Sequence, residues 1–321
     1  MTRHIAVVVV NWNGRHLLDA CLESVAGQLP APDRVIVVDN GSTDGSLAHL
    51  RSRWPGVVAL DAGANLGFSG GNNLGIRNAL AAQAELILLL NNDAQLLPGA
   101  LAELVAGLAE AGPAAWASAP KILYRARPET IWSAGGRFDW WRGLPLDRGF
   151  NDADRGQYDR NELVEFANAC CLLMRASALE AVGLLDEAYF MYFEDADLAA
   201  RALAAGGRVA YRPAARVLHD VQGSSGGGGP GPSPSALYFW TRNRSRFIAR
   251  NAPDPVRRAV AHSYTLGTRV VRMGQAALAG RGGEARLIAR ALIDGYFRRA
   301  TGDTYPRSAV TVSRPAGEAR V

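Results

Sequence analysis

Short apolar runs alternate with amphipathic stretches along the first third of the chain. Four runs have the length of buried strands, at residues 5–10, 35–38, 57–60 and 86–90. Apolar residues at three- and four-residue spacing predict helices at 17–25, 42–50, 74–82 and 98–109. Strands that alternate with helices imply right-handed crossovers. The pattern therefore predicts an α/β fold with a mostly parallel sheet and helices on both faces.

The alternation is less regular in the second half. Residues 132–141 are rich in aromatics and predict a loop or hairpin, and short strands are expected on either side of Pro213. The other predicted elements are strands at 165–174, 209–211 and 216–218 and helices at 176–182, 195–205, 236–248 and 256–300. Residues 223–234 are mainly Gly, Ser and Pro, which is typical of a flexible connection. We therefore predict a main domain at 1–234 and a helical extension at 235–321.

The composition is that of a folded protein. The chain has 321 residues, of which 48% are hydrophobic and 20% charged, and this excludes an intrinsically disordered protein. No apolar run reaches the roughly 18 residues of a membrane-spanning helix, and the first residues lack a signal-peptide pattern. Cys21, Cys170 and Cys171 have neither zinc-ligand nor redox spacing. We expect them to be reduced, buried thiols of a cytoplasmic protein.

Charge is distributed unevenly along the chain. Residues 235–321 hold 16 Arg against 5 acidic residues, a net charge of about +11, whereas residues 1–234 carry about −6. A basic segment attracts polyanions, either nucleic acid or an anionic membrane surface. This segment lacks the interleaved aromatics of a stacking platform for nucleic acid and has an amphipathic pattern. We expect no nucleic-acid partner and a disordered tail at the C-terminus.

Two apolar runs end on a carboxylate. Asp39 precedes residues suited to a tight turn. Its carboxylate could accept a hydrogen bond from a nucleobase imide or from a ribose hydroxyl. The alternative is a turn Asp that accepts from local backbone N–H groups. Asp93 follows Asn91, Asn92 and the run at 86–90. A carboxylate beside amides suits Mg²⁺ or Mn²⁺, and the alternative is an Asp that caps the next helix. Because parallel strands share one carboxyl edge, we expect a ligand site there.

Three carboxylates, Glu194, Asp195 and Asp197, follow a stretch rich in aromatic residues. Acidic groups this close repel one another, and a fold that keeps them beside aromatic rings usually uses one as a base. The alternative is a helix N-terminus that attracts acidic residues through the helix dipole. That alternative accounts for Asp195 and Asp197 but leaves the aromatic residues unexplained. We therefore expect a carboxylate-dependent site.

Two weaker signals point to the same edge. Residues 65–73 are a glycine-rich loop with interleaved Asn, which lets a backbone approach a ligand, although they are not the dinucleotide-binding fingerprint. His219 follows a short apolar run. It is either a structural histidine or, as a neutral imidazole, a second ligand of a metal held by Asp93.

Taken in order, these segments resemble the inverting glycosyltransferases of family 2, particularly the bacterial rhamnosyltransferase-like branch. The resemblance runs over about residues 5–250 and is carried by residues 8–13, 38–44, 65–73, 91–93 and 183–187, the acidic cluster and His219. It implies a GT-A fold, which is a Rossmann-like, mostly parallel sheet, here with a basic C-terminal helical extension. It also implies a dTDP- or UDP-linked sugar donor and a divalent cation, Mg²⁺ or Mn²⁺.

The resemblance implies roles for individual residues as well. Asp195 would be the general base, and Glu194 would help to hold the acceptor together with Asp197 and Trp132. Asp93 and His219 would hold the metal ion. The donor-binding residues would be Asn11, Asp39, Asn65, Gly67, Gly70, Asn72, Asn73, Asn91 and Asn92.

We therefore expect an inverting, metal-dependent glycosyltransferase of cell-envelope polysaccharide synthesis. It would move a sugar, with rhamnose as a candidate, to a hydroxyl of a glycan or lipid-linked acceptor. One base takes the acceptor proton, and a cation stabilises the diphosphate leaving group. The alternatives are a sugar nucleotidyltransferase, for which residues 11–15 form a poor triphosphate loop, and a non-catalytic scaffold of envelope assembly. A homodimer is left open.

The basic extension has an expected partner of its own. Its apolar residues at 236–240, 247–248 and 287–297 are interleaved with Arg residues. Such helices can lie in a membrane interface with aromatic rings buried and Arg near anionic headgroups. We expect peripheral docking on the inner face of the cytoplasmic membrane, where a lipid-linked acceptor would be found. The alternatives are helices packed on the main domain or an oligomer contact.

Overall fold

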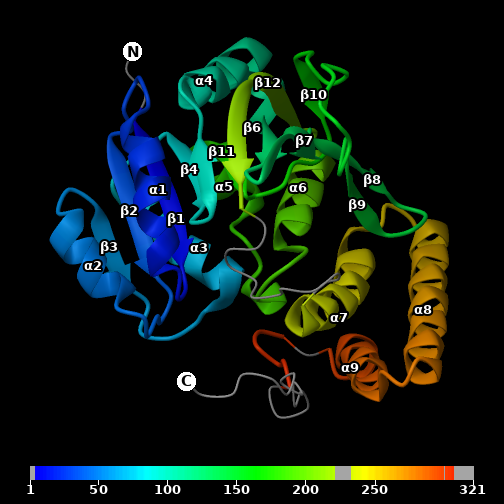
Figure 1. Cartoon of the computed structure of the whole chain (residues 1–321). Coiled ribbons are helices and arrows are strands. Elements are labelled where there is room, and N and C mark those ends of the chain that lie inside the picture. The colour runs from blue at the N-terminus through cyan, green and yellow to red at the C-terminus, as the bar shows by residue number, and fades with distance from the viewer. Residues whose placement is uncertain (1–3, 221–232, 300, 307–321) are drawn as a thin grey trace.

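A twisted mixed sheet separates two layers of helices in the computed structural model of the chain (Figure 1). The structure describes residues 4–220, 233–299 and 301–306. The sheet and the two helix layers confirm the α/β fold that the hydrophobic pattern predicts.

The largest sheet of the described residues has ten strands, in the order β10-β12-β6-β11-β4-β1-β2-β3, with β5 paired to β12 and β7 to β6. β1 is parallel to β2 and β4, and β2 is parallel to β3. β11 lies antiparallel between β4 and β6, and β8 and β9 form a separate hairpin. The strands are β1 (Ile5–Asn11), β2 (Arg34–Asp39), β3 (Val58–Asp61), β4 (Leu86–Asn91), β5 (Ala94–Leu96), β6 (Ala115–Tyr124), β7 (Arg127–Ser133), β8 (Gly136–Asp139), β9 (Leu144–Asp147), β10 (Glu162–Val164), β11 (Cys171–Arg175) and β12 (Arg208–His219).

Helices cover both faces of this sheet. Successive side chains of a strand point to opposite faces, so Val7 and Val9 pack with α1, α2 and α4 while Ala6 and Val8 pack with α3, α5 and α6. Because both faces are covered, β1 and β4 appear in the sequence as continuous apolar runs. The helices are α1 (Arg15–Ala26), α2 (Ser46–Arg53), α3 (Gly67–Ala81), α4 (Ala100–Ala111), α5 (Ala176–Val182), α6 (Glu194–Ala204), α7 (Pro234–Asn251), α8 (Pro255–Leu278) and α9 (Gly282–Leu292), with short turns of other helix types at Gly112–Ala114, Glu187–Tyr189 and Ile293–Phe297.

The structure corrects the predicted glycine-rich loop at residues 65–73, because α3 already begins at Gly67. Glycine serves close packing in this helix. A Cβ added at Gly75 would lie 2.3 Å from Cγ1 of Val8, so α3 approaches β1 only because no side chain intervenes.

Two predicted strands also differ from the structure. The strand expected at 165–174 is shorter, since β11 begins at Cys171. The two strands expected around Pro213 are a single strand, β12, with a register shift between Arg212 and Arg216. A bulge tolerates Pro because the ladder is already interrupted there.

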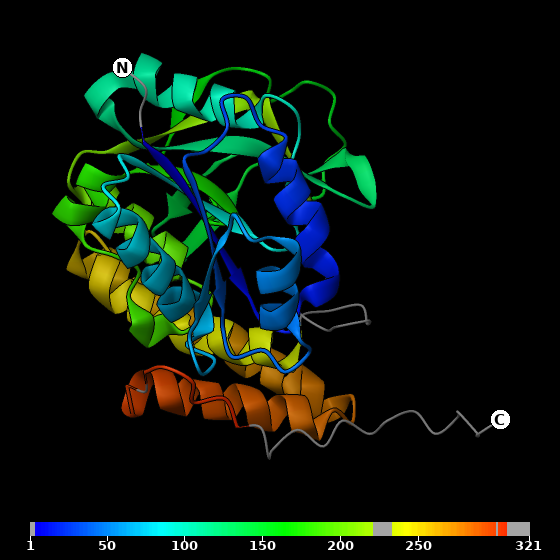
Figure 2. The same cartoon turned by 90° about the vertical axis from the view of Figure 1, so that its left-hand side faces the viewer.

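The C-terminal helices α7 and α9 lie in the lower part of the molecule in both views, at the end to which β1, β2 and β4 point, and Figure 1 shows α8 standing upright at one side (Figures 1 and 2). Arg242 and Arg244 of α7 are 1% and 3% exposed. Leu287 and Ile288 of α9 are buried against α7. The structure thus corrects the expectation that these residues face a membrane, because they pack inside the protein.

None of the described helices is long and apolar enough to cross a membrane. The predicted flexible connection lies outside the described residues except for residues 233 and 234, and the chain beyond residue 306 lies outside them as well.

Candidate active site

The predicted site residues come from distant parts of the chain and lie at the carboxyl ends of β1, β2, β4 and β12. Asn11 at the end of β1 lies opposite Asp39 at the end of β2. Asp93 follows β4, and His219 at the end of β12 lies opposite Ala94, the first residue of β5. The strand order therefore brings these residues to one edge.

The two carboxylate oxygens of Asp39 differ in their surroundings. Asp39 is 2% exposed, and its Oδ1 accepts a hydrogen bond from the Ser42 N–H at 2.9 Å. Oδ2 is buried and accepts no hydrogen bond from any described residue. A buried oxygen without a donor is unfavourable, so Oδ2 suits an N–H or O–H group of a ligand. Asp39 therefore closes a turn and also offers a free acceptor.

Asn11 and Asn92 are buried and bond to each other. Nδ2 of Asn92 donates to Oδ1 of Asn11 at 2.8 Å. A Cβ at Gly14 would lie 2.3 Å from this Nδ2, so the turn after β1 requires glycine. Asn91 is half-buried, and its backbone N–H donates to the Cys170 carbonyl oxygen at 2.8 Å. These bonds fix the segment that leads to Asp93, the predicted metal ligand.

Asn65 and Gly67 shape the entry into α3. Oδ1 of Asn65 accepts from the Gly67 N–H at 2.9 Å. Gly67 has a φ of +74°, and a Cβ there would lie 2.3 Å from the carbonyl oxygen of Phe190. Gly70 is buried one turn further along α3. The close approach at Gly67 places the predicted donor-binding segment directly beside the chain that leads to Glu194.

Asn72 and Asn73 are buried and bond to protein groups. Nδ2 of Asn72 donates to the Phe68 carbonyl oxygen in its own helix, at 2.9 Å. Asn73 makes two bonds with the backbone of Leu185, one to its carbonyl oxygen at 2.8 Å and one from its N–H at 3.1 Å. Both side chains, predicted to bind the donor, hydrogen-bond to the protein backbone, and Asn73 connects α3 to the segment before the acidic cluster.

Asp93 and His219 meet at the carboxyl edge. Nε2 of His219 lies 3.1 Å from Oδ1 of Asp93, and the two residues are 6% and 5% exposed. Nδ1 of His219 is buried without a hydrogen-bond partner in the described parts of the chain. Trp132 packs edge-on against the His219 ring, with centroids 4.5 Å apart. Trp132, predicted beside the acceptor, therefore also contacts the pair predicted to hold the metal.

A carboxylate and an imidazole are a donor set that Mg²⁺ or Mn²⁺ accepts. Within the described ranges, no group of three or more His, Cys, Asp or Glu side chains is arranged for a metal. Mg²⁺ commonly takes only one or two protein ligands and fills its shell with water and substrate phosphates. The pair at Asp93 and His219 therefore fits a cation that is shared with a diphosphate.

Glu194 and Asp195 begin α6 and differ in exposure. Glu194 is 5% exposed, and its Oε2 has no hydrogen-bond partner in the described structure, whereas Asp195 is half-buried. Asp195 accepts from the N–H groups of Ala196 at 2.7 Å and Ala169 at 3.3 Å. Burial raises the pKa of Asp195 although these N–H groups oppose the rise. Burial, and then the charge of Asp195, raise the pKa of Glu194 well above its usual value. Asp195 is thus the more accessible of the two carboxylates.

Asp197, predicted beside the acceptor, is buried and hydrogen-bonded to protein groups. It is 0% exposed, and its oxygens accept from the Tyr189 O–H at 3.2 Å, Arg201 Nε at 2.8 Å and Asn251 Nδ2 at 2.8 Å. These bonds connect α6 to α7 and to the turn before the acidic cluster.

Asp147 on β9 is a candidate site residue that the sequence did not single out. Ser133 Oγ donates to its Oδ1 at 2.6 Å. Burial raises the pKa of Asp147 to about 7; the Ser133 hydrogen bond opposes this rise and the charge of Asp195 adds to it. Asp147 therefore lies within electrostatic range of Asp195. A single Asp in a short strand gives no sequence signal, and only the β8–β9 hairpin brings it there.

Tyr192 lies near both groups of acidic residues. Burial raises its pKa to about 12, and the charges of Glu194 and Asp93 add to the rise. The Tyr192 phenol therefore lies within electrostatic range of both Glu194 and Asp93. The carboxyl edge as a whole offers a free acceptor at Asp39, the Asp93–His219 pair, and a half-buried carboxylate at Asp195.

Comparison with known proteins gives concordant results. The model of the family described as Glycosyl transferase family 2 matches residues 6–183. An N-acetylglucosaminyl-diphospho-decaprenol L-rhamnosyltransferase of Mycobacterium tuberculosis (strain CDC 1551 / Oshkosh) is 33% identical over 247 residues, which are 70% of this chain and 79% of the relative. The low-salt glycan biosynthesis hexosyltransferase Agl10 of Haloferax volcanii is 27% identical over 206 residues, 63% of this chain and 62% of the relative.

The fold has solved counterparts. The mannosyltransferase PcManGT from Pyrobaculum calidifontis, in complex with GDP-Man and Mn²⁺, matches with a TM-score of 0.55 at 18% identity. The match covers 93% of this chain and 82% of that protein. At this identity the likeness shows a shared GT-A fold.

Proposed function

Because the chain belongs to glycosyl transferase family 2 and is a glycosyltransferase, we propose that it transfers L-rhamnose from a nucleoside-diphosphate sugar to a lipid-linked glycan, with inversion and with a divalent cation. One observation carries this proposal. Asp93 and His219 meet at 3.1 Å on the sheet edge that also holds the unpartnered oxygen of Asp39 and, nearby, the half-buried carboxylate of Asp195.

The relatives support the choice of substrates. The 33% identical relative is named as a rhamnosyltransferase that acts on N-acetylglucosaminyl-diphospho-decaprenol. We propose a corresponding acceptor class here, an N-acetylglucosaminyl diphospho-polyprenol used for cell-envelope glycan. Family membership decides against the sugar nucleotidyltransferase and the scaffold that the sequence left open.

In the proposed reaction, the acceptor oxygen bonds to the anomeric carbon as the bond from that carbon to the diphosphate oxygen breaks. Asp195 takes the proton of the acceptor hydroxyl. Attack comes from the face opposite the diphosphate, so the configuration inverts. A raised pKa makes Asp195 a stronger base than an exposed carboxylate. Asp39 would accept a hydrogen bond from the base or ribose of the donor.

The metal side of the proposed site consists of Asp93 and His219. A divalent cation bound there would supply charge stabilisation to the departing diphosphate. Trp132 packs on the ring of His219, and the Asn11–Asn92 hydrogen bond fixes the segment before Asp93. The structure of PcManGT, which has a related fold, contains GDP-Man and Mn²⁺, and this supports a cation at the site proposed here.

The proposed function is tested by incubating the purified full-length chain with Mn²⁺ or Mg²⁺ and a synthetic N-acetylglucosaminyl diphospho-lipid. We expect transfer from dTDP-rhamnose to exceed transfer from UDP- and GDP-hexoses by at least about tenfold, a typical result of one favourable pocket contact. Nuclear magnetic resonance of the product reports the anomeric configuration. Preferred transfer from another sugar would overturn the rhamnose assignment, and retention would overturn inversion.

We also propose peripheral membrane binding, through α8. Five apolar side chains along α8, Val256, Val260, Val270, Val271 and Leu278, are between 41% and 92% exposed. At 100° per residue they fall on one side of the helix. Such an exposed apolar side, in a region with a net charge of about +11, is typical of a helix that lies in an anionic lipid interface.

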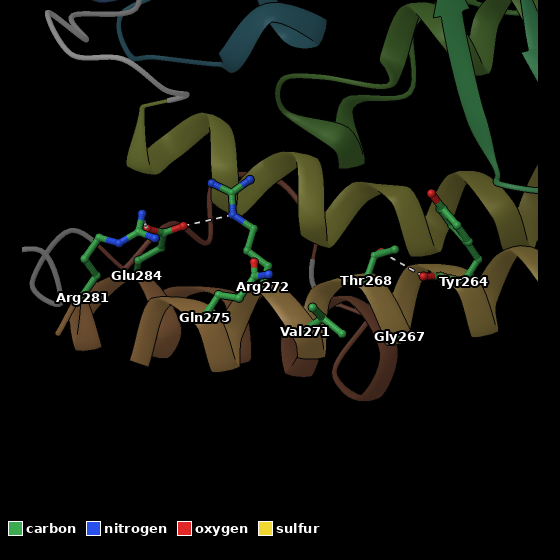
Figure 3. A pocket seen from close by; sticks show the side chains of 8 residues that line it. All are labelled: Tyr264, Gly267, Thr268, Val271, Arg272, Gln275, Arg281 and Glu284. Carbon is green, nitrogen blue, oxygen red and sulfur yellow. Dashed lines mark hydrogen bonds and ion pairs between the residues drawn. The ribbon is translucent and has the colours of Figure 1, made fainter. Parts of the chain in front are cut away.

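The charged residues of α8 leave this apolar side uninterrupted. Figure 3 shows Arg272 turning to Glu284 of α9, with which it pairs at 3.0 Å across a hollow between the two helices. Val271 and Gly267 border the same hollow.

We expect the full-length protein to float with vesicles that contain anionic lipid, and to float less as salt is raised, because salt screens the arginines. The double substitution Val260→Asp, Val271→Asp should lower the floated fraction several-fold, since it places charge in the apolar interface. Leu29→Asp is the matched control, because Leu29 is 80% exposed on the main domain. Equal flotation of the two variants would show that α8 does not dock.

A further inference from the structure

The chain immediately before the proposed base has a strained backbone. Phe190, Tyr192 and Phe193 have φ values of +67°, +66° and +73°, a region that non-glycine residues rarely adopt. Around Phe190 the chain makes a γ-turn closed by a 2.8 Å backbone hydrogen bond. Conformations of this kind persist only where the surrounding structure enforces them. The groups that enforce them here therefore control how the first turn of α6 is presented.

Asn243 of α7 holds this strained segment. Its Nδ2 donates to the carbonyl oxygens of Tyr189, Met191 and Tyr192, at 2.9, 2.7 and 2.8 Å. Two amide hydrogens serve three acceptors, so one hydrogen is shared. Asn243 is 1% exposed, so its amide is shielded from bulk solvent. Three carbonyl oxygens of the strained segment therefore converge on one nitrogen atom.

Arg242 orients Asn243 and reaches the same segment. Its Nε donates to Oδ1 of Asn243 at 2.8 Å, which fixes the amide with its nitrogen toward the carbonyls. Its Nη2 donates to the carbonyl oxygen of Tyr189 at 2.7 Å and of Ala188 at 3.1 Å. Burial lowers the pKa of Arg242 to about 10, so the guanidinium stays charged and keeps its donors at neutral pH.

These bonds are not needed merely to attach α7 to the main domain. Arg246 pairs with Asp186 at 3.0 Å, and Phe247 packs against Phe138 with ring centroids 5.8 Å apart. Ile248 is 1% exposed in the main core. The helix therefore has separate anchors, and the hydrogen bonds described above go to the strained segment.

We propose that Asn243 and Arg242 are positioning residues for glycosyl transfer, which act through the backbone of residues 189–193 to hold Asp195 toward the acceptor. The proposal rests on the proposed role of Asp195 as base. Both positioning residues lie beyond residues 6–183, the span that the family model matches.

The test is Asn243→Asp, which keeps the shape of the side chain but replaces the donor with an acceptor that faces three carbonyl oxygens. We expect kcat to fall by about 10²-fold, the size of effect that a misplaced catalytic group produces, while the Kd of the donor changes less than about twofold. The acid limb of the kcat–pH profile should shift, because the surroundings of the base change. Hydrogen exchange of amides 188–196 should accelerate, while that of β1 and β4 stays unchanged.

Two further variants separate positioning from stability. Ile248→Ala leaves a cavity beneath the same helix, so it should lower Tm while kcat stays within about twofold at temperatures well below Tm. Arg242→Lys keeps a charged donor and should retain more of kcat than Arg242→Ala.

The proposal is overturned if Asn243→Asp keeps wild-type kcat or fails to fold. It is also overturned if Ile248→Ala and Asn243→Asp lose kcat in the same proportion to their loss of Tm. Asp195→Asn is measured in parallel. Full activity of that variant would remove the base assignment itself, whereas an inactive Asp195→Asn beside an active Asn243→Asp would reject only the positioning role.

Discussion

Asp195→Asn is expected to lower kcat by about 10²–10⁴-fold, or about 3–5 kcal/mol of activation free energy, with donor binding nearly unchanged. The amide keeps the shape of the side chain but cannot take the proton of the acceptor hydroxyl. Steady-state rates of sugar transfer and calorimetric titration with the nucleoside diphosphate measure the two effects separately. Transfer at a near wild-type rate would reject Asp195 as the base.

The neighbouring carboxylates provide the controls for this substitution. Glu194→Gln should reduce kcat less, because Glu194 is only 5% exposed and is therefore less accessible to an acceptor hydroxyl than the half-buried Asp195. Asp197→Asn should act chiefly on stability, since Asp197 accepts from Arg201 at 2.8 Å and is 0% exposed. A loss of kcat shared equally by all three variants would point to general disruption of α6.

The raised pKa of Asp195 also fixes the direction of the pH dependence. A base acts only when deprotonated, and burial moves its pKa above the usual value for Asp. The rate should therefore fall as pH drops through this raised pKa, at a higher pH than for an exposed carboxylate. The kcat–pH profile of Asp195→Asn should lack this acid limb.

Removal of the divalent cation is expected to abolish transfer. Loss of the charge stabilisation that a metal gives a leaving group costs several kcal/mol, so activity should fall on the order of 10³-fold or more on chelation. Added Mn²⁺ or Mg²⁺ should restore it. Activity that persists in excess chelator would reject metal dependence.

Asp93→Ala should weaken binding of the nucleoside diphosphate when metal is present and have little effect when metal is absent. The reason is that, in the proposed site, Asp93 and His219 would act on the diphosphate through the cation that they hold. Asp33→Ala is the control, because Asp33 accepts from the Ile5 N–H at 2.7 Å at the opposite edge of the sheet. Unchanged calorimetric affinity in Asp93→Ala would remove Asp93 from the metal site.

The sequence determined the fold class and placed the candidate site residues Asp39 and Asp93 at one edge of the sheet. β1 and β4 are buried on both faces, so apolar residues occupy nearly every position of these strands and form continuous runs in the sequence. The end of each run is then visible as a polar residue, so the hydrophobic pattern by itself assigns Asp39 and Asp93 to the carboxyl edge. Glycine was harder to interpret, because Gly75 serves helix packing and Gly67 a positive φ.

The tertiary structure decided which polar side chains face the site. Asp195 and Asp197 are two residues apart on α6, which turns them about 200° away from each other, so only one of them can point to a given side. The sequence shows both carboxylates alike. Packing against α7 then engages Asp197, which accepts from Asn251 at 2.8 Å.

The hydrophobic pattern does not show long-range pairing, and only the family resemblance placed His219 beside Asp93. His219 and Asp93 are 126 positions apart, and they meet only because β12 pairs with β5. The arginines of α7 suggested a charged surface, yet Arg242 is 1% exposed and bonds to backbone carbonyls. Hydrophobic burial is periodic along the chain and can be read from it, whereas the partner of a polar group is set by whichever distant segment the fold places within hydrogen-bond distance.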